Sequence, residues 1–81
     1  MMIVWTGING SSAISAIGLE RVDAELAQPP ARIHVRFKVS RRTYVYEVGD
    51  RAYFDKFVDA ASKGRFYVFV IKERFDYVEK Y

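Results

Sequence analysis

The sequence predicts a small α+β domain, in which a three-stranded antiparallel sheet is covered on one face by one or two C-terminal helices. Two stretches, 32–39 and 43–48, alternate between inward apolar and outward polar positions, which is typical of half-buried strands. A third stretch, 51–62, carries apolar residues at helical spacing. The 81 residues are enough for one hydrophobic core, so we interpret 1–81 as a single domain.

The first part of the chain predicts two weaker strands. Residues 2–5 are apolar and could add a short strand at the sheet edge. The turn-rich loop 7–12 leads to the small, apolar segment 13–19, which we interpret as the first strand of the main sheet, with a bulge at Gly18. The connection 23–30 ends in two prolines, which hold the chain extended and donate no ladder hydrogen bonds.

The stretches 32–39 and 43–48 should pair as a hairpin. In the first, every odd position is apolar and every even position is basic or histidine. We pair Val39 with Tyr44, and a shift of two residues would keep the apolar sides matched, whereas an odd shift would not. The connecting segment contains two arginines, which fit poorly in a two-residue turn with positive φ, so we expect a longer loop.

The clearest helix signal lies over 51–62. Asp50 is a good N-cap residue, Lys63 places a cation near the C-terminus, and Gly64 suits a left-handed position just past the helix. The helix should pack on the sheet through one apolar stripe, consisting of Tyr53, Phe54, Phe57, Val58 and Ala61.

The segment 65–74 allows two interpretations from its residues. Its β-branched and aromatic side chains favour a strand. The spacing of Phe66, Phe69 and Val70, followed by two charged residues, also suits a short second helix.

The composition indicates a folded protein without cysteine. Hydrophobic residues make up 51% of the chain and aromatic residues 16%, unlike disordered proteins. Because cysteine is absent, disulfides and cysteine-ligated zinc are impossible, and a cytoplasmic location is the default expectation. The chain has no run of about 18 apolar residues, and its start lacks a basic leader, so we expect neither a membrane span nor a signal peptide.

Positive charge is concentrated between residues 32 and 42. The net charge of the chain is +3, and this segment holds five cations and no acid. A solvated sheet face, whose cations discourage edge association, explains the cluster about as well as a phosphate-binding surface does. The second interpretation predicts that the nucleic-acid-binding residues are Arg32, Arg36, Lys38, Arg41, Arg42, Lys63 and Arg65.

The other candidate residues favour structural roles. Tyr44 and Tyr46 could stack on unpaired bases, but they share the side that must receive the helix, so we favour core positions with their hydroxyls at the edge. Ser11 and Ser12 could form an anion nest, but such serines more often cap a turn or a strand entry. His34 is the only histidine, and the sequence offers it no evident catalytic or metal-binding partners. We therefore expect no catalytic site, no metal and no cofactor.

Several short motifs follow one another along residues 11–77. They are Ser11-Ser12-Ala13-Ile14, Ala16-Ile17-Gly18-Leu19, Val35-Arg36-Phe37, Tyr44-Val45-Tyr46, Ala60-Ala61-Ser62-Lys63-Gly64-Arg65-Phe66 and Ile71-Lys72-Glu73-Arg74-Phe75-Asp76-Tyr77. In this order the motifs resemble the KTSC domain, a small family named for its occurrence at the C-terminus of some lysyl-tRNA synthetases. The family also occurs as free-standing small proteins in bacteria and phages.

The resemblance implies more about fold than about function. It implies that 65–74 is a short helix after Gly64, and we follow that implication over the strand propensity. The function of the family is unassigned, and RNA binding is suggested for it from the synthetase context. The chain departs from the family pattern at Val68, where asparagine is frequent, and at Asp76, which replaces the usual proline.

Taken together, these observations predict a non-enzymatic binding module that contacts RNA through a basic sheet face and the hairpin tip. A protein-interaction adaptor of bacterial or phage origin is the alternative. An adaptor would use exposed aromatic side chains such as Trp5, Tyr67 and Phe69.

Overall fold

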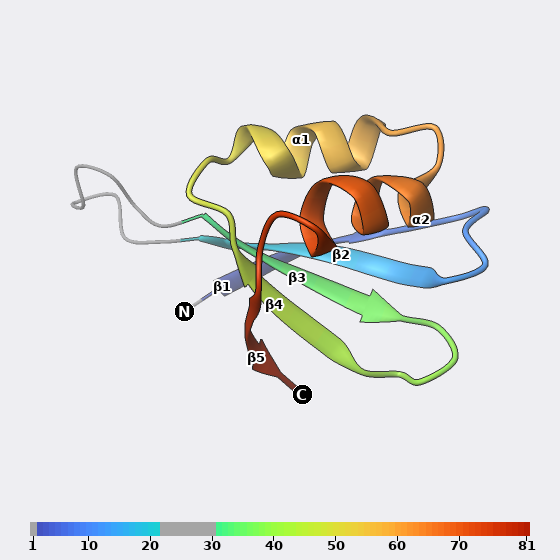
Figure 1. The fold of residues 1–81 in the computed structure, drawn as a ribbon. Helices are drawn as coiled ribbons and strands as arrows, with labels where there is room; N and C mark the ends of the chain where they lie inside the picture. Colours follow the sequence, from blue (N-terminus) through green and yellow to red (C-terminus); the bar gives the residue numbers. More distant parts are fainter. Residues whose placement is uncertain (1, 22–30) are drawn as a thin grey trace.

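The computed structural model describes residues 2–21 and 31–81 and contains two short helical segments on one face of a five-stranded antiparallel sheet (Figure 1). The strand order across the sheet is β1-β2-β3-β4-β5, the same as the order along the chain. The elements are β1 (Met2–Gly7), β2 (Ile14–Arg21), β3 (Arg32–Phe37), β4 (Thr43–Glu47), α1 (Ala52–Asp59), α2 (Lys63–Phe66), the π-helix η1 (Tyr67–Lys72) and β5 (Tyr77–Lys80).

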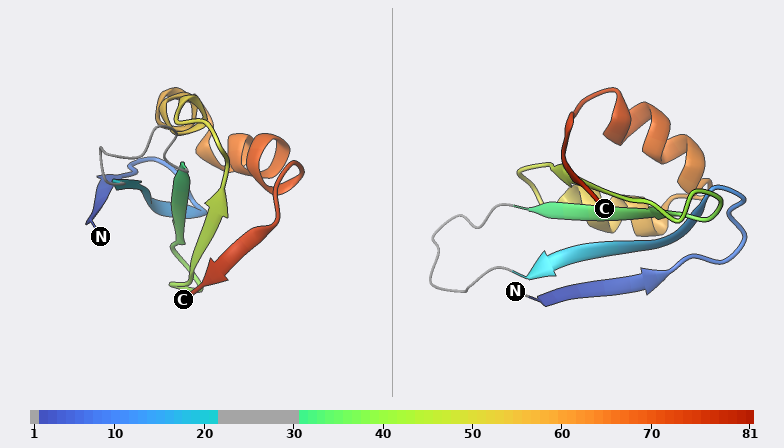
Figure 2. Two further views of the ribbon diagram at one scale, coloured as in Figure 1. Left: turned by 90° about the vertical axis from the view of Figure 1, so that its left-hand side faces the viewer. Right: turned by 90° about the horizontal axis from the view of Figure 1, so that it is seen from below.

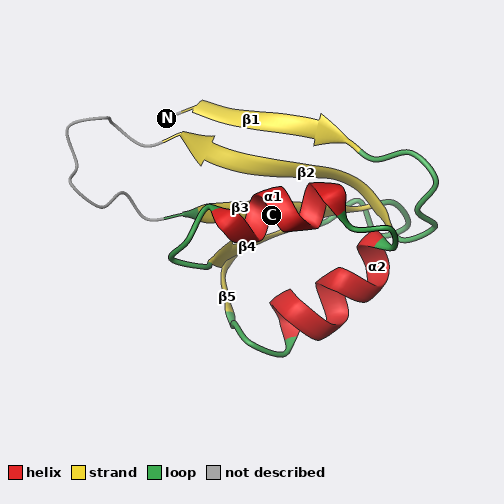
Figure 3. Ribbon diagram, turned by 90° about the horizontal axis from the view of Figure 1, so that it is seen from above, coloured by secondary structure: helices red, strands yellow, loops and turns green. Residues whose placement is uncertain are grey.

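The α+β class is confirmed, but the prediction of three strands is wrong. The predicted edge strand at 2–5 is present and extends to Gly7 as β1, which pairs with β2. After the helices the chain returns to pair β5 with β4, for example Tyr44 with Lys80. Every residue of β5 is exposed, so this strand lacks the alternating pattern that identified the others. Figure 3 shows β1 and β5 at opposite edges of the sheet.

Gly18 allows a close approach and does not form the predicted bulge. The irregularity of β2 lies between Ile14 and Ala16, whereas Gly18 pairs directly with Trp5 on one side and His34 on the other. A Cβ atom at Gly18 would lie only 2.7 Å from Cγ2 of Ile3 and 3.0 Å from Cε3 of Trp5. The missing side chain thus leaves space that the indole ring covers. The predicted connection 23–30 lies outside the described residues.

The β3–β4 hairpin forms with a register different from the predicted one. Val35 lies opposite Tyr44, and Ile33 lies opposite Tyr46. The predicted partner of Tyr44 was Val39, so the register is displaced by four residues. An even displacement leaves the same side chains on the same face, which is why the apolar pattern alone did not reveal it.

The loop between β3 and β4 is longer than two residues, as expected. β3 already ends at Phe37, and Val39 therefore lies in the loop with 93% of its surface exposed instead of continuing the core face. Arg41 adopts a positive φ of 59° to complete the turn. The backbone N–H of Arg41 donates to the carbonyl of Phe37 at 3.1 Å.

The predicted helix over 51–62 is confirmed as the shorter α1. The Asp50 carboxylate accepts a hydrogen bond from the backbone N–H of Ala52 at 2.9 Å, so Asp50 contributes to the cap. Phe54 and Phe57 are buried, as the apolar stripe predicted. The prediction for Gly64 is wrong, because α1 has already ended at Ala60, where the backbone turns extended with ψ of 135°.

The second helical segment, in which α2 continues directly into η1, confirms what the family resemblance implied for 65–74. Gly64 lies inside α2, whose N-cap Ser62 accepts a hydrogen bond from the backbone N–H of Arg65 at 3.3 Å. The helix then widens into η1, where Tyr67 and Ile71 are buried. Tertiary packing of these two residues outweighs the strand propensity of the segment.

Side chains from the sheet and both helical segments form the core. Phe57, Ile17, Ile33 and Val35 are completely buried, and Tyr46 retains only 3% of its exposure. The view along the sheet in Figure 2 shows both helical segments on the same side of the strands. We call this side the helix face and the opposite side the far face. Among the described residues, no helix is long and apolar enough to cross a membrane.

Candidate nucleic-acid interface

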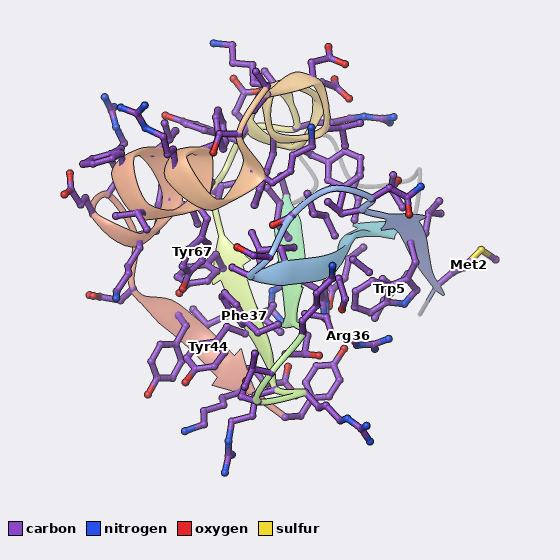
Figure 4. The ribbon with its side chains drawn as sticks, turned by 90° about the vertical axis from the view of Figure 1, so that its right-hand side faces the viewer. Met2, Trp5, Arg36, Phe37, Tyr44 and Tyr67 are labelled. Carbon is purple, nitrogen blue, oxygen red and sulfur yellow. The ribbon has the colours of Figure 1, made fainter. Side chains whose placement is uncertain are left out.

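Cations of β3 were expected to point into solvent, and the structure corrects this expectation. Arg32 lies beside Glu47, with 3.6 Å between Nη2 and Oε2, and its side chain is only 35% exposed. Arg36 lies over the indole ring of Trp5, with 4.2 Å from Cζ to the ring centroid. Its Nε also donates to Oγ1 of Thr43 at 3.3 Å. Figure 4 shows the Arg36–Trp5 pair on the side of the sheet away from Phe37.

The ammonium groups of two further predicted contact residues donate hydrogen bonds to backbone carbonyls of the chain itself. The ammonium group of Lys38 donates to the carbonyl of Ser11 at 2.5 Å, which joins the hairpin loop to the β1–β2 loop. The ammonium group of Lys63 donates to the carbonyl of Ala60 and thereby satisfies the end of α1. Ser11 caps the entry to β2, as predicted, because its hydroxyl accepts from the backbone N–H of Ile14 at 3.1 Å.

The remaining predicted residues, Arg41, Arg42 and Arg65, are exposed. Arg41 and Arg42 occupy the loop between β3 and β4, and Arg65 lies in α2. We call residues 38–42 the hairpin tip. Alternation in the sequence indicates a face of the sheet and not what covers that face, so it did not reveal the internal contacts of Arg32 and Arg36.

A groove lined by aromatic rings lies next to the hairpin tip. Its volume is about 890 Å³. It lies between the β4–β5 edge and the second helical segment, and we call it the tyrosine groove. It is lined by Phe37, Ser40, Tyr44, Tyr46, Tyr67, Lys72, Phe75, Asp76 and Tyr77.

The walls of the tyrosine groove are aromatic rings that meet edge to face. The centroid of Tyr44 lies 5.0 Å from that of Tyr77 and 5.7 Å from that of Phe37. Tyr77 is 52% exposed, and Tyr44 is half-buried. The ammonium group of Lys80 lies 5.6 Å from the Tyr44 centroid. The prediction that Tyr44 and Tyr46 belong to the core thus holds fully for Tyr46 and partly for Tyr44.

Two buried hydroxyls form the floor of the groove. The hydroxyl oxygens of Tyr46 and Tyr67 are 2.5 Å apart. Burial raises the pKa of both phenols above the ordinary value, and for Tyr46 the hydrogen bond to Tyr67 raises the pKa further. The pair therefore stays neutral at physiological pH. Two hydroxyls carry two protons, and their mutual bond uses one of them, so one O–H donor is left over.

Residues that were assigned to no site form a polar cluster on the far face. His34 is 2% exposed and Glu20 is 8% exposed. Nε2 of His34 lies 2.9 Å from Oε1 of Glu20, and Nδ1 lies 2.9 Å from the hydroxyl of Tyr81. The sequence signal was a lone histidine at an outward strand position. Its partners lie 14 and 47 residues away, so no local pattern could identify them.

The aromatic residues proposed for a protein adaptor are not equally available. Tyr67 is buried, and Trp5 is half-buried against His34 and Arg36. Phe69 is 55% exposed, and Val68 beside it is 41% exposed. These two residues border a second, mainly apolar depression of about 580 Å³.

Comparison with known proteins supports the fold of the chain. No family model matches the sequence, and no curated protein matches it significantly. A crystal structure of a KTSC domain protein from Yersinia pestis superimposes with a TM-score of 0.74, at 27% sequence identity and with 93% of each chain covered. The resemblance indicated by the sequence motifs is thereby confirmed, and this chain has the fold of the KTSC domain.

Proposed function

We propose that this chain is a non-enzymatic binding module for single-stranded RNA, with the tyrosine groove and the hairpin tip as its contact surface. The observation that carries the proposal is the pair Tyr44 and Tyr77, whose partly exposed rings border an open groove beside a basic loop. Unpaired bases stack on such rings, and each stack is worth about 1–3 kcal/mol. The proposed site therefore lies around one edge of the sheet and not on its far face.

The cations around the groove suit a nucleic-acid backbone, and among the described residues they outnumber the one acid that lines the groove, Asp76. Lys72 lines the groove, and Lys80 lies against the Tyr44 ring. Ser40 also lines the groove, and the exposed Arg41 and Arg42 follow it directly in the chain. In this arrangement the rings would hold bases, while the surrounding cations would neutralise phosphates and release counterions.

The floor hydroxyls add a polar contact to this surface. The remaining O–H donor of the Tyr46–Tyr67 pair could bond to a carbonyl oxygen of a base. Because the phenols stay neutral, they do not repel a nearby phosphate. We infer a cytoplasmic setting and a bacterial or phage origin for the module, from the absence of cysteine and from the bacterial KTSC protein that shares its fold.

The proposal can be tested by fluorescence anisotropy with a short, mixed-sequence single-stranded RNA at several salt concentrations. The double variant Arg41→Glu, Arg42→Glu should bind more weakly, and its dependence of log affinity on log salt should be shallower by roughly one to two units. The matched control is Arg51→Glu, Lys56→Glu, which makes the same charge change at exposed positions around α1. Equal effects of the two double variants would show that only overall charge matters.

A second pair of variants tests the stacking contact. Tyr77→Ala should lower affinity about 5- to 150-fold, the equivalent of one lost stack. Phe69→Ala removes an equally exposed aromatic ring outside the groove and should leave RNA affinity unchanged. If the unmodified chain shows no salt-sensitive binding at micromolar concentration, the RNA proposal is wrong.

A protein-interaction adaptor is the second candidate. The observation that favours it is the exposure of Val68 and Phe69 next to an apolar depression on the second helical segment. Such a contact would bury apolar surface and would depend little on salt. Phe69→Ala would then weaken partner binding while Tyr77→Ala would not, which is the opposite of the pattern expected for RNA.

A further inference from the structure

The far face contains three hydrogen-bonded side chains that lie outside the proposed RNA-binding surface. Glu20 comes from β2, His34 from β3, and Tyr81 follows β5. Both Glu20 and His34 are buried, and each ring nitrogen of His34 has a hydrogen-bonding partner at 2.9 Å. Tyr81, in contrast, is 51% exposed. The order carboxylate, imidazole, hydroxyl therefore runs from the interior toward solvent.

With Glu20 ionised and His34 neutral, the chemistry of the three groups sets the direction of the hydrogen bonds. An ionised carboxylate can only accept, so the Glu20 contact places the proton of a neutral His34 on Nε2. Nδ1 then carries a lone pair and accepts the hydrogen bond from the Tyr81 hydroxyl. His34 is thus positioned as a general base for the phenol, and Glu20 stabilises the imidazolium that forms when the proton moves.

Neighbouring residues hold this arrangement in place. The Trp5 ring meets His34 edge to face, with 5.9 Å between centroids, and Arg36 lies over Trp5. Thr43 accepts a hydrogen bond from Nε of Arg36 and exchanges two backbone hydrogen bonds with Tyr81, at 2.6 and 2.8 Å. Glu20 is in direct contact with the imidazole, and the Arg36 guanidinium lies behind the indole ring. Glu79 belongs to the same cross-strand row as His34, two strands away and opposite Val45.

We propose that Tyr81 is a nucleophilic modification site that takes up an acyl group from an activated acyl donor. The phenol oxygen attacks the acyl carbonyl carbon, an O–C bond forms, and the phenol proton passes to Nδ1 of His34. The bond between the acyl carbon and the leaving group breaks, and the leaving group receives the proton from His34. The product is an O-acyl tyrosine. This inference is independent of RNA binding at the tyrosine groove.

Tyr77 provides an internal control for this inference within the same molecule. Tyr77 is 52% exposed, against 51% for Tyr81, so the two residues are exposed to a similar extent. Tyr77 packs against Tyr44, whereas Tyr81 packs against His34. A difference in reactivity between the two phenols therefore reports their different neighbours, and the His34 variant described below assigns it to the base.

The test is limited acetylation of the folded chain with N-acetylimidazole at neutral pH, followed by peptide mass spectrometry. Tyr81 should be acetylated at least about tenfold faster than Tyr77, since a positioned general base contributes about 100-fold or more to such steps. Equal rates for the two tyrosines in the unmodified chain would overturn the proposal, whatever any variant does.

Two variants separate a base from a structural role. His34→Gln should lower the Tyr81 rate to that of Tyr77 and leave the Tyr77 rate unchanged. Glu20→Gln keeps a hydrogen-bond acceptor for Nε2 but removes the charge, so the Tyr81 rate should fall only partly. A simultaneous rise in both tyrosine rates would indicate loosening of the fold, and a Tyr81 rate that stays high without His34 would contradict the proposed proton transfer.

Discussion

The centres of the two sheet faces are buried by different means. On the helix face, Phe57 and Ile71 from the helical segments cover Ile33 and Val35, and all four are completely buried. On the far face no helix is present among the described residues, yet Val45 is also completely buried and His34 retains only 2% exposure. Long side chains of the sheet itself, such as Trp5 and Arg36, cover this face.

In the part of the chain that the structure describes, the centre of the far face is thus buried without a second layer of secondary structure. The row Trp5, Gly18, His34 and Val45 runs straight across four strands. Gly18 adds no side chain to that row, so the indole ring can reach His34. Packed apolar side chains bury the helix face, whereas hydrogen bonds and ring contacts bury the centre of the far face. Substitutions on the two faces should therefore differ in how much stability they cost.

The largest effect is expected on the helix face. Phe57→Ala should lower the free energy of unfolding by about 3–5 kcal/mol, because truncating a buried aromatic ring leaves a cavity in a packed core. Urea denaturation followed by circular dichroism would measure the loss. Phe69→Ala is the control, since its ring is 55% exposed. A loss below about 1 kcal/mol for Phe57→Ala would contradict the packing of α1 on the sheet.

On the far face, Glu20→Ala should cost about 1–3 kcal/mol, since it leaves the Nε2–H group of a buried histidine without its acceptor. Glu47→Ala removes a carboxylate from an exposed pair with Arg32 and should cost at most about 1 kcal/mol. Thermal unfolding of both variants gives the comparison. Similar losses would mean that the far face is effectively open to water.

Gly18→Ala tests the close approach directly. The added methyl group meets Ile3 and Trp5 below ordinary contact distance, so we expect a loss of about 1–3 kcal/mol from overpacking. Gly7→Ala is the matched control in the neighbouring strand, where no atom lies within 4 Å of the added carbon. Tryptophan fluorescence should shift in the Gly18 variant and stay constant in the Gly7 variant, because Trp5 is the single tryptophan.

The hydroxyl pair of the tyrosine groove gives a smaller, pH-dependent effect. The folded state raises the pKa of Tyr46 and Tyr67 above the unfolded value of about 10, so the folded chain holds these protons more tightly. The contribution of the two phenols to the free energy of unfolding is complete below about pH 10. It is lost as the pH rises further, by up to about 1.4 kcal/mol per pH unit for each phenol.

Urea titrations at increasing alkaline pH would measure this loss. Tyr46→Phe should show a shallower decline than the unmodified chain. Tyr77→Phe, which changes an exposed phenol in the same groove, is the control and should not alter the slope. A decline that is identical in all three proteins would contradict the buried hydroxyl pair.

The sequence predicted the elements whose pattern matches their environment. The stripe of α1 and the alternation of β3 and β4 reflect one buried side each, so the period identified them. The register of the hairpin was displaced by four residues because an even displacement preserves that period. β5 escaped prediction because all of its residues are exposed, and the second helical segment was recovered only through the family motifs.

The site was predictable only in part, for a related reason. The basic residues were visible in the sequence, but the contacts that occupy Arg36 and Lys38 join distant segments. The tyrosine groove also needs three separate segments, since Tyr44, Tyr67 and Tyr77 come from β4, η1 and β5. Groups of residues from distant segments depend on the topology of the fold, so a pattern along the sequence does not reveal them.

The order of the strands has a consequence for how the molecule assembles. Because the first four strands are neighbours both in the chain and in the sheet, their hairpins can form by short loop closures, which favour rapid folding. β5 follows the helical segments in the chain, lies at the sheet edge and contributes four exposed residues. We expect the amide protons of β5 to exchange with solvent much faster than those of the central strand β3, because an exposed edge strand with few buried contacts opens at a low free-energy cost.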